Sequence, residues 1–171
     1  MIEVTQGLDA PGLTILQRIS DPLRLCTIYA DAENNLVIGF GGTRNNIMDW
    51  FSNLDPTIEA STFIGDIKYW IYVYRPSKVT LVGHSQGGAH ALKIASWLPN
   101  QNREVVTFGG LPIDSDPGCN VTNYLRRDDP MAWVPWLIFG LRYRGKIVKL
   151  GPKSWPRLSG HLPENYEKEL S

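Results

Sequence analysis

The sequence feature that most constrains the fold is a strand–turn–helix pattern near the middle of the chain. Four strand-forming residues, 79–82, lead into Gly83-His84-Ser85-Gln86-Gly87, and a helical stretch begins immediately afterwards. A Gly-x-Ser-x-Gly turn in this context is typical of a nucleophile elbow, in which a sharp turn exposes the serine hydroxyl. Because such a turn is tight, Gly83 and Gly87 are required by sterics. The alternative is an ordinary turn in which Ser85 caps the helix, which explains the serine but not both glycines.

Composition favours a single domain and argues against one class of partner. The 171 residues are 43% hydrophobic, with no internal repeat, low-complexity tract or linker, so residues 1–171 are predicted to form one domain with a substantial core. The 17 basic and 17 acidic residues balance, which argues against nucleic acid as the main partner, because phosphate binding needs a basic face. Cys26 and Cys119 are predicted to be buried free thiols, with one disulfide as the alternative.

The hydropathy of the chain indicates where the protein resides. Residues 1–6 have neither the basic start nor the apolar run of a signal peptide. No stretch approaches the roughly 20 apolar residues of a membrane span. We therefore expect a soluble, cytoplasmic protein, and its oligomeric state is left open.

Strand and helix signals alternate along the chain. Residues 23–30 and 36–40 are β-rich runs joined by a short polar segment, which predicts an antiparallel hairpin near the N-terminus. The other predicted strands are residues 104–108, residues 120–125 and a strand pair within 141–150 that turns near Gly145. The other predicted helices are residues 61–74 and 164–170. This alternation predicts an α/β sandwich around a largely parallel sheet.

A serine becomes a strong nucleophile only when a base takes its proton, and an imidazole is the usual base. The sequence has three histidines. His84 lies in the turn and is expected to point away from the attacking hydroxyl, while His90 lies on the following helix as a packing or surface residue. His161 is in a loop bounded by Gly and Pro, from which a side chain can reach a site. The alternative for His161 is a solvated surface residue.

The base in turn needs a carboxylate, and two adjacent acids are candidates. Asp128 and Asp129 directly follow a predicted strand, at the end of the sheet where catalytic loops gather. Because neighbouring side chains point opposite ways, one is expected to face the site and the other to pair with Arg126 or Arg127. The alternative is that both aspartates are only turn-forming residues before Pro130.

Negative charge on a reacting carbonyl oxygen requires preorganised hydrogen-bond donors. The backbone N–H of Gln86, directly after Ser85, is one candidate. Thr43 is the second, because it follows an earlier predicted strand and offers both an N–H and a hydroxyl. These two residues are the predicted oxyanion donors.

Several of these segments are similar to motifs of one family. Residues 40–43, Phe-Gly-Gly-Thr, are similar to its Phe-Arg-Gly-Thr/Ser, and Asp49-Trp50 and Asn53-Leu54 follow as they do there. Residues 83–89 match its Gly-His-Ser-Leu-Gly-Gly-Ala except at Gln86. Together these motifs resemble the class 3 lipases, the fungal triacylglycerol lipase-like family of α/β-hydrolases. The likeness runs from about Thr27 to Tyr166.

The resemblance implies an α/β-hydrolase-like three-layer sandwich, with a mostly parallel central sheet and an antiparallel N-terminal hairpin. It also implies a serine hydrolase that cleaves carboxylic esters, lipid or small acyl, through an acyl-enzyme. Ser85 would be the nucleophile, His161 the base and Asp129, aligned on the family's Asp-x-Val-Pro, the acid. Thr43 and Gln86 would hold the oxyanion, and neither a cofactor nor a metal is expected.

The chain departs from the family in the region of the lid. Only 41 residues lie between Thr43 and Ser85, too few for the usual lid, so an open site for small or accessible esters is expected. In the apolar stretch 133–139, Trp133, Trp136 and Leu137 are expected to line an acyl pocket or to contact a lipid surface peripherally. Ordinary core packing is the alternative.

Two other functions fit the same residues. One is an acyltransferase that passes the acyl group to an alcohol instead of water. The other is a non-catalytic hydrolase-fold module that binds a ligand or a membrane surface and keeps the elbow as scaffold.

Overall fold

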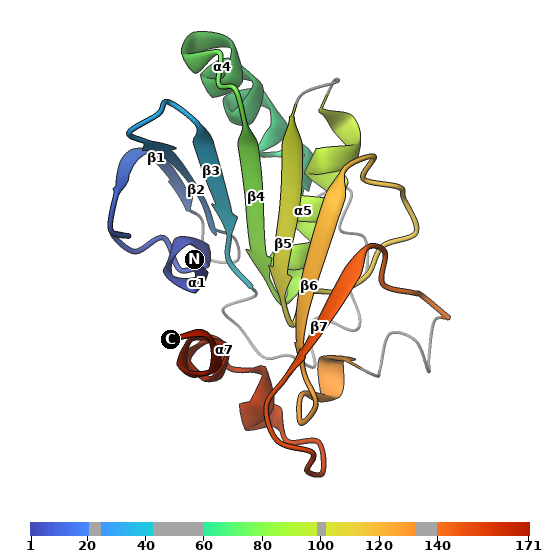
Figure 1. The fold of residues 1–171 in the computed structure, drawn as a ribbon. Helices are drawn as coiled ribbons and strands as arrows, with labels where there is room; N and C mark the ends of the chain where they lie inside the picture. Colours follow the sequence, from blue (N-terminus) through green and yellow to red (C-terminus); the bar gives the residue numbers. More distant parts are fainter. Residues whose placement is uncertain (21–24, 43–59, 99–101, 133–139) are drawn as a thin grey trace.

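The computed structural model describes residues 1–20, 25–42, 60–98, 102–132 and 140–171 (Figure 1). Its strands form one seven-stranded sheet whose spatial order follows the chain. β2 pairs antiparallel with β1 and with β3, and β3 to β7 run parallel to one another. The strands are β1 (Leu13–Ser20), β2 (Leu25–Asp31), β3 (Leu36–Phe40), β4 (Val79–His84), β5 (Arg103–Phe108), β6 (Asn120–Arg126) and β7 (Lys146–Leu150). The predicted mostly parallel sheet with an antiparallel N-terminal hairpin is confirmed.

Helices cover both faces of this sheet. Figure 1 shows α4 (Ile64–Tyr74) and α5 (Gln86–Trp97) behind it, and α1 (Ile2–Thr5) and α7 (Pro163–Leu170) in front. The rear core packs the apolar sides of α4 and α5 against the sheet, and the front core packs Ile2, Val4 and Tyr166 against strand residues. Burial of these two apolar surfaces stabilises the predicted three-layer arrangement.

The front layer is shorter than the rear one. A hollow of about 400 Å³ remains between α1 and α7, and its floor is the sheet surface of Val106, Phe108 and Tyr124. Ser85 is not among the residues that line this hollow. The hollow is therefore separate from the site around Ser85.

Strand β1 was not predicted from the sequence. It pairs with β2 along its length, but the register shifts between Ile15 and Gln17. This bulge breaks the alternation of apolar and polar residues by which a half-buried strand is identified. The sheet therefore opens with three antiparallel strands instead of the predicted pair.

The prediction of a strand pair within residues 141–150 is wrong. Only the second half is a strand, β7, which continues the parallel sheet beside β6. Gly145, at the predicted turn, has a positive φ of 80°, and a Cβ there would lie 2.4 Å from the carbonyl oxygen of Val121. The glycine thus permits a close approach to β6 instead of closing a hairpin.

Three further observations concern expectations stated above. Cys26 is a buried free thiol and Cys119 is a partly exposed one, so no disulfide joins them. Within the described ranges, no helix combines the length and the apolar character that crossing a membrane requires. The assignment of residues 1–171 to a single domain stays a prediction.

Candidate active site

The strand–turn–helix pattern folds as predicted, with Ser85 in a strained turn between β4 and α5. Ser85 has φ 56° and ψ −126°, a conformation that side-chain-bearing residues rarely adopt. A Cβ on Gly83 would lie 2.2 Å from the Gly87 carbonyl oxygen, and one on Gly87 would lie 2.2 Å from that of Phe40. Both approaches are far inside van der Waals contact. The steric requirement for two glycines is confirmed.

Backbone hydrogen bonds hold this turn against the end of the neighbouring strand. The N–H of Ser85 donates to the carbonyl oxygen of Phe108 at 3.1 Å, and the N–H of Leu111 donates to that of Ser85 at 3.2 Å. These bonds offset part of the conformational cost at Ser85, because they fix the turn from both sides.

A hydrogen-bonded chain joins three side chains from three separate elements. The Oγ of Ser85 lies 2.8 Å from Nε2 of His161, and Nδ1 of His161 lies 2.8 Å from Oδ2 of Asp129. His161 ends a short 3-10 helix, η2 (Leu158–His161), and Asp129 follows β6. An ionised carboxylate only accepts hydrogen bonds, so the imidazole proton is on Nδ1. Nε2 is then left to accept the hydroxyl proton of Ser85.

The carboxylate of Asp129 is fully buried and accepts from three donors of the described residues. Besides His161, the backbone N–H of Met131 donates to its Oδ1 at 2.8 Å, and the hydroxyl of Tyr166 donates to its Oδ2 at 2.6 Å. A buried charge is tolerated only when its hydrogen-bonding capacity is satisfied in this way. The geometry keeps Asp129 directed at the imidazole.

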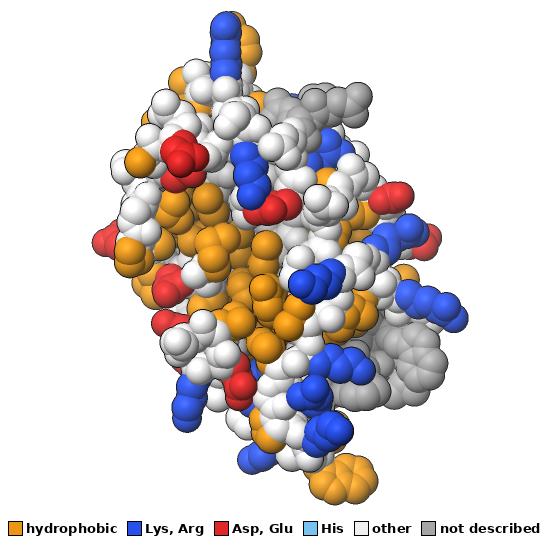
Figure 2. Space-filling model, in the orientation of Figure 1, with side chains coloured by type: hydrophobic (Ala, Val, Ile, Leu, Met, Phe, Trp, Pro, Cys, Tyr) orange, Lys and Arg blue, Asp and Glu red, His pale blue; other side chains and the backbone are white. Residues whose placement is uncertain are grey.

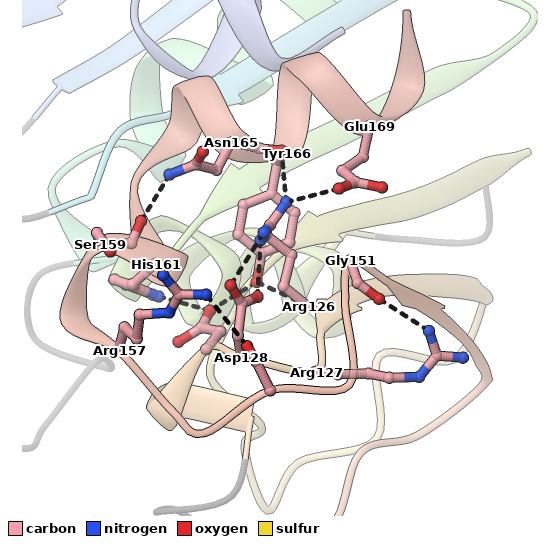
Figure 3. A network of polar contacts seen from close by, with 12 residues as sticks. Arg126, Arg127, Asp128, Gly151, Arg157, Ser159, His161, Asn165, Tyr166 and Glu169 are labelled. Atoms are coloured by element: carbon pink, nitrogen blue, oxygen red, sulfur yellow. Dashed lines mark hydrogen bonds and ion pairs between the residues drawn. The ribbon is translucent and has the colours of Figure 1, made fainter.

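The neighbouring Asp128 points away from His161 and binds a cation instead. Its two oxygens accept from Nε and Nη2 of Arg126, each at 3.0 Å (Figure 3). The predicted pairing of one acid with Arg126 or Arg127 is therefore confirmed, with Arg126 as the partner. Burial raises the pKa of Asp128, but the hydrogen bonds and charge of Arg126 outweigh it, so the pKa lies below its usual range.

The Arg126 side chain also ties the C-terminal helix to the sheet. Its Nη1 donates to the carbonyl oxygen of Asn165 at 2.9 Å and to Oε1 of Glu169 at 3.2 Å (Figure 3). Its backbone N–H donates to the hydroxyl oxygen of Tyr166 at 3.2 Å. Burial and the Asp129 charge raise the pKa of Tyr166, so its hydroxyl keeps the proton that it donates to Asp129.

The backbone of Asp128 positions the segment that carries His161. Its carbonyl oxygen accepts from the N–H of Arg157 at 2.8 Å. A Cβ on Gly160 would lie 2.5 Å from the same oxygen. The segment after β6 that contains Asp129 is thus also hydrogen-bonded to Arg157, the residue before η2.

His84 occupies a place that the sequence did not predict. Among the described residues it makes no hydrogen bond to the Ser85 hydroxyl. Its ring lies near that of His161, with centroids 5.0 Å apart, and its Nε2 donates to the His161 carbonyl oxygen at 2.8 Å. Burial and the neighbouring His161 lower the pKa of His84 to about 4, so it is neutral near pH 7. The elbow motif identifies His84 by its position in the sequence, but only the fold brings it next to His161.

Gly109 is a second residue that the sequence analysis did not place in the site. It has a φ of 54°, and a Cβ there would lie 2.7 Å from the Tyr166 hydroxyl, 2.8 Å from Oδ2 of Asp129 and 3.1 Å from Nδ1 of His161. The Thr-Phe-Gly sequence at the end of β5 is the signal that identifies it. A side chain there would collide with the Asp129–His161 pair.

The remaining predicted residues divide into two groups. His90 is buried with its ring against Phe63, in agreement with a packing role, and Gln86 is buried at the start of α5. The rest lie outside the described residues: Thr43, Trp133, Trp136 and Leu137. Gly42 lies beside the elbow, since a Cβ on it would be 3.0 Å from that of Ser85.

Comparison with known proteins places the fold. No model of a protein family and no curated protein sequence matches the chain. Solved structures do, among them Rhizomucor miehei lipase in its propeptide complex, with 16% identity over 89% of this chain and 65% of that one, at a TM-score of 0.66. A triacylglycerol lipase from Penicillium expansum has 14% identity over 87% of this chain and 74% of that one, at a TM-score of 0.65.

A third similar structure is a triacylglycerol lipase whose catalytic centre is described as a serine protease triad. It has 18% identity over 82% of this chain and 68% of that one, at a TM-score of 0.66. This chain spans 65% and 56% of the two Rhizomucor lipase chains that it matches. The predicted resemblance is therefore confirmed at the level of architecture: the chain has the α/β-hydrolase fold of the fungal triacylglycerol lipases.

Proposed function

We propose that this protein is a serine hydrolase that cleaves carboxylic esters through an acyl-enzyme. The observation that carries the proposal is the continuous hydrogen-bonded chain from the Ser85 hydroxyl through His161 to the buried carboxylate of Asp129. A strained serine at a strand end, a base with an accepting Nε2 and an acid that fixes the tautomer are what nucleophilic acyl transfer requires.

In the proposed reaction, Ser85 Oγ attacks the ester carbonyl carbon while Nε2 of His161 takes the hydroxyl proton. The imidazolium that forms is stabilised by Asp129. The bond to the alkoxy oxygen then breaks, and His161 returns the proton to the leaving alcohol. Water, activated by the same imidazole, adds to the acyl-enzyme and releases the acid, which restores Ser85.

The tetrahedral oxyanion is assigned to two donors. Gln86 follows Ser85 at the N-terminus of α5, where helix N–H groups and the positive end of the helix dipole face the reacting carbon. Thr43 is proposed as the second donor because it follows Gly42, which lies beside Ser85. A donor of this kind contributes about 3 kcal/mol to transition-state stabilisation.

The proposed substrates are lipid esters or small acyl esters. The similar solved structures are triacylglycerol lipases, which supports an ester of a fatty acid. The short segment between Thr43 and Ser85 supports an open site without lid-gated activation. Trp133, Trp136 and Leu137 are proposed to line the acyl pocket or to contact lipid.

Hydrolysis of p-nitrophenyl esters of increasing acyl length tests the proposal. We expect turnover by the wild type, a preferred chain length, and no abrupt rise in rate at the substrate's micelle threshold. Folded Ser85→Ala protein is the matched control and should be inactive at every length. Equal rates for wild type and Ser85→Ala, or no turnover by folded wild type, would support the non-catalytic module instead.

A further inference from the structure

Charge is unevenly distributed, although the net charge of the chain is zero. Residues 130–163 contain six of the 17 Lys and Arg residues and none of the 17 Asp and Glu residues. The six are Arg142, Arg144, Lys146, Lys149, Lys153 and Arg157. All are exposed, and none is in an ion pair with a carboxylate of the described residues. Figure 2 shows Lys and Arg side chains gathered over the β7 side and the lower end of the molecule.

Large apolar side chains are exposed among these cations. Trp155 is 89% exposed, Leu158 is 67% exposed and Leu162 is 49% exposed. They lie in the segment between β7 and α7 that carries His161. An indole so fully in water, next to exposed leucines, indicates a contact that the isolated chain does not satisfy.

Hydrogen bonds hold this segment to the body of the protein. The N–H of Arg127 donates to the Leu150 carbonyl oxygen at 3.0 Å, and the Arg127 Nη1 donates to that of Gly151 at 3.0 Å (Figure 3). The Arg157 N–H is bound to Asp128 at 2.8 Å. Trp155 therefore projects from a turn that is anchored on both sides, rather than from a chain end.

We propose that this surface binds the face of an anionic lipid bilayer. It consists of Lys149, Lys153, Trp155, Arg157, Leu158 and Leu162, called here the basic apolar surface. Cations attract the anionic headgroups, and the indole and leucines enter the boundary between headgroups and acyl chains. A nucleic acid would use the cations but offers nothing to exposed leucines, so the mixture favours lipid. Binding there would place the end of the sheet that carries Ser85 and His161 next to the bilayer.

Vesicle co-sedimentation of Ser85→Ala protein tests the proposal without any turnover, so it stands or falls separately from the proposed reaction. The probes are phosphatidylcholine vesicles with and without a minority of phosphatidylglycerol. We expect binding to the anionic vesicles, weakened by salt. The double variant Lys149→Gln/Lys153→Gln should weaken it on the order of tenfold, and Trp155→Ala should weaken it roughly severalfold.

Matched controls lie on and beside α4, at the other end of the molecule. Lys68→Gln/Arg75→Gln removes two exposed cations, and Tyr72→Ala removes an aromatic side chain that is 74% exposed. Both variants should bind vesicles as the parent does. The proposal is overturned by equal binding to neutral and anionic vesicles, by an equal loss in the control variants, or by no binding at all. Tighter binding of single-stranded DNA through the same lysines would also overturn it.

Discussion

Two polar regions meet at the end of β6, and they use adjacent carboxylates in different ways. On one side, Asp129 faces a neutral imidazole that can gain a proton, together with two uncharged donors, Met131 and Tyr166. On the other side, Asp128 faces the permanent cation of Arg126. Both carboxylates are buried. The two residues are of the same type and both buried, so the difference between them comes from the groups that each carboxylate contacts.

The difference has an electrostatic consequence. The charge of Asp128 is already neutralised by Arg126, which leaves little field for a positive charge that develops elsewhere. No Lys or Arg of the described residues is paired with Asp129, so in the proposed reaction its charge is available to an imidazolium at His161. The Asp128 side holds segments of the chain together, and the Asp129 side is the one proposed to take part in the reaction. The variants below test that separation.

Asp129→Asn should have the largest effect. An asparagine can hold the wrong tautomer of His161 and cannot stabilise its protonated form, so kcat should fall about 10⁴-fold. Steady-state ester hydrolysis measures the loss. If folded Asp129→Asn protein retains the wild-type rate, Asp129 is not the acid.

Asp128→Asn should act on stability instead. It leaves Arg126 buried beside an amide, so the free energy of unfolding should fall by about 3 kcal/mol, while kcat changes less than about tenfold. Urea unfolding and ester hydrolysis measure the two quantities. The double variant Arg126→Met/Asp128→Leu is the control, because removing both charges should recover part of the lost stability. A loss of kcat as large as that expected for Asp129→Asn would mean that Asp128, rather than Asp129, is the acid of the reaction.

The two regions should also respond to different ranges of pH. The folded pKa of His84 is lowered to about 4, so the unfolded chain binds its proton first, and stability falls as the pH drops from about 6.5 toward 4. This corresponds to about 2 kcal/mol between pH 7 and pH 5. The contribution of Asp128 is lost only at lower pH, because its pKa is lowered.

Urea unfolding of Ser85→Ala protein across this range measures both effects. The His84→Asn variant should reduce the change in unfolding free energy between pH 7 and pH 5. Asp128→Asn should change the unfolding free energy profile only at lower pH. If the free energy of unfolding changes equally steeply with pH above about pH 5 with and without His84, this pH dependence does not come from His84.

Tyr166→Phe should lower stability and kcat together, each by less than the aspartate variant that affects that quantity most. It removes the hydroxyl that donates to Asp129 and accepts from the Arg126 backbone N–H, and so a group that contacts both regions. Loss of one donor to a charged group should lower stability by about 2 kcal/mol and kcat by roughly tenfold. Stability and kcat both unchanged in Tyr166→Phe would show that the two regions are independent of each other.

Part of the fold and of the candidate site could be predicted from the sequence alone. The elbow, the parallel strands and the Asp128–Arg126 pair were predicted, because short-range sterics and neighbour geometry determine them. Strand β1 was missed because a bulge breaks its alternation, and Gly145 was misread because a glycine that permits a close approach looks like a turn. The contacts of His84 and Gly109 with the base and acid join residues far apart in sequence. No local pattern encodes them.

The account rests on Ser85 being a nucleophile activated through His161, and covalent labelling with a fluorophosphonate measures this most directly. Intact-mass spectrometry should find one adduct per chain, mapped to Ser85 by peptide analysis. Labelling should be slowed strongly by Asp129→Asn and little by Asp128→Asn. Folded wild-type protein that stays unlabelled, or that reacts at another residue, would contradict the account.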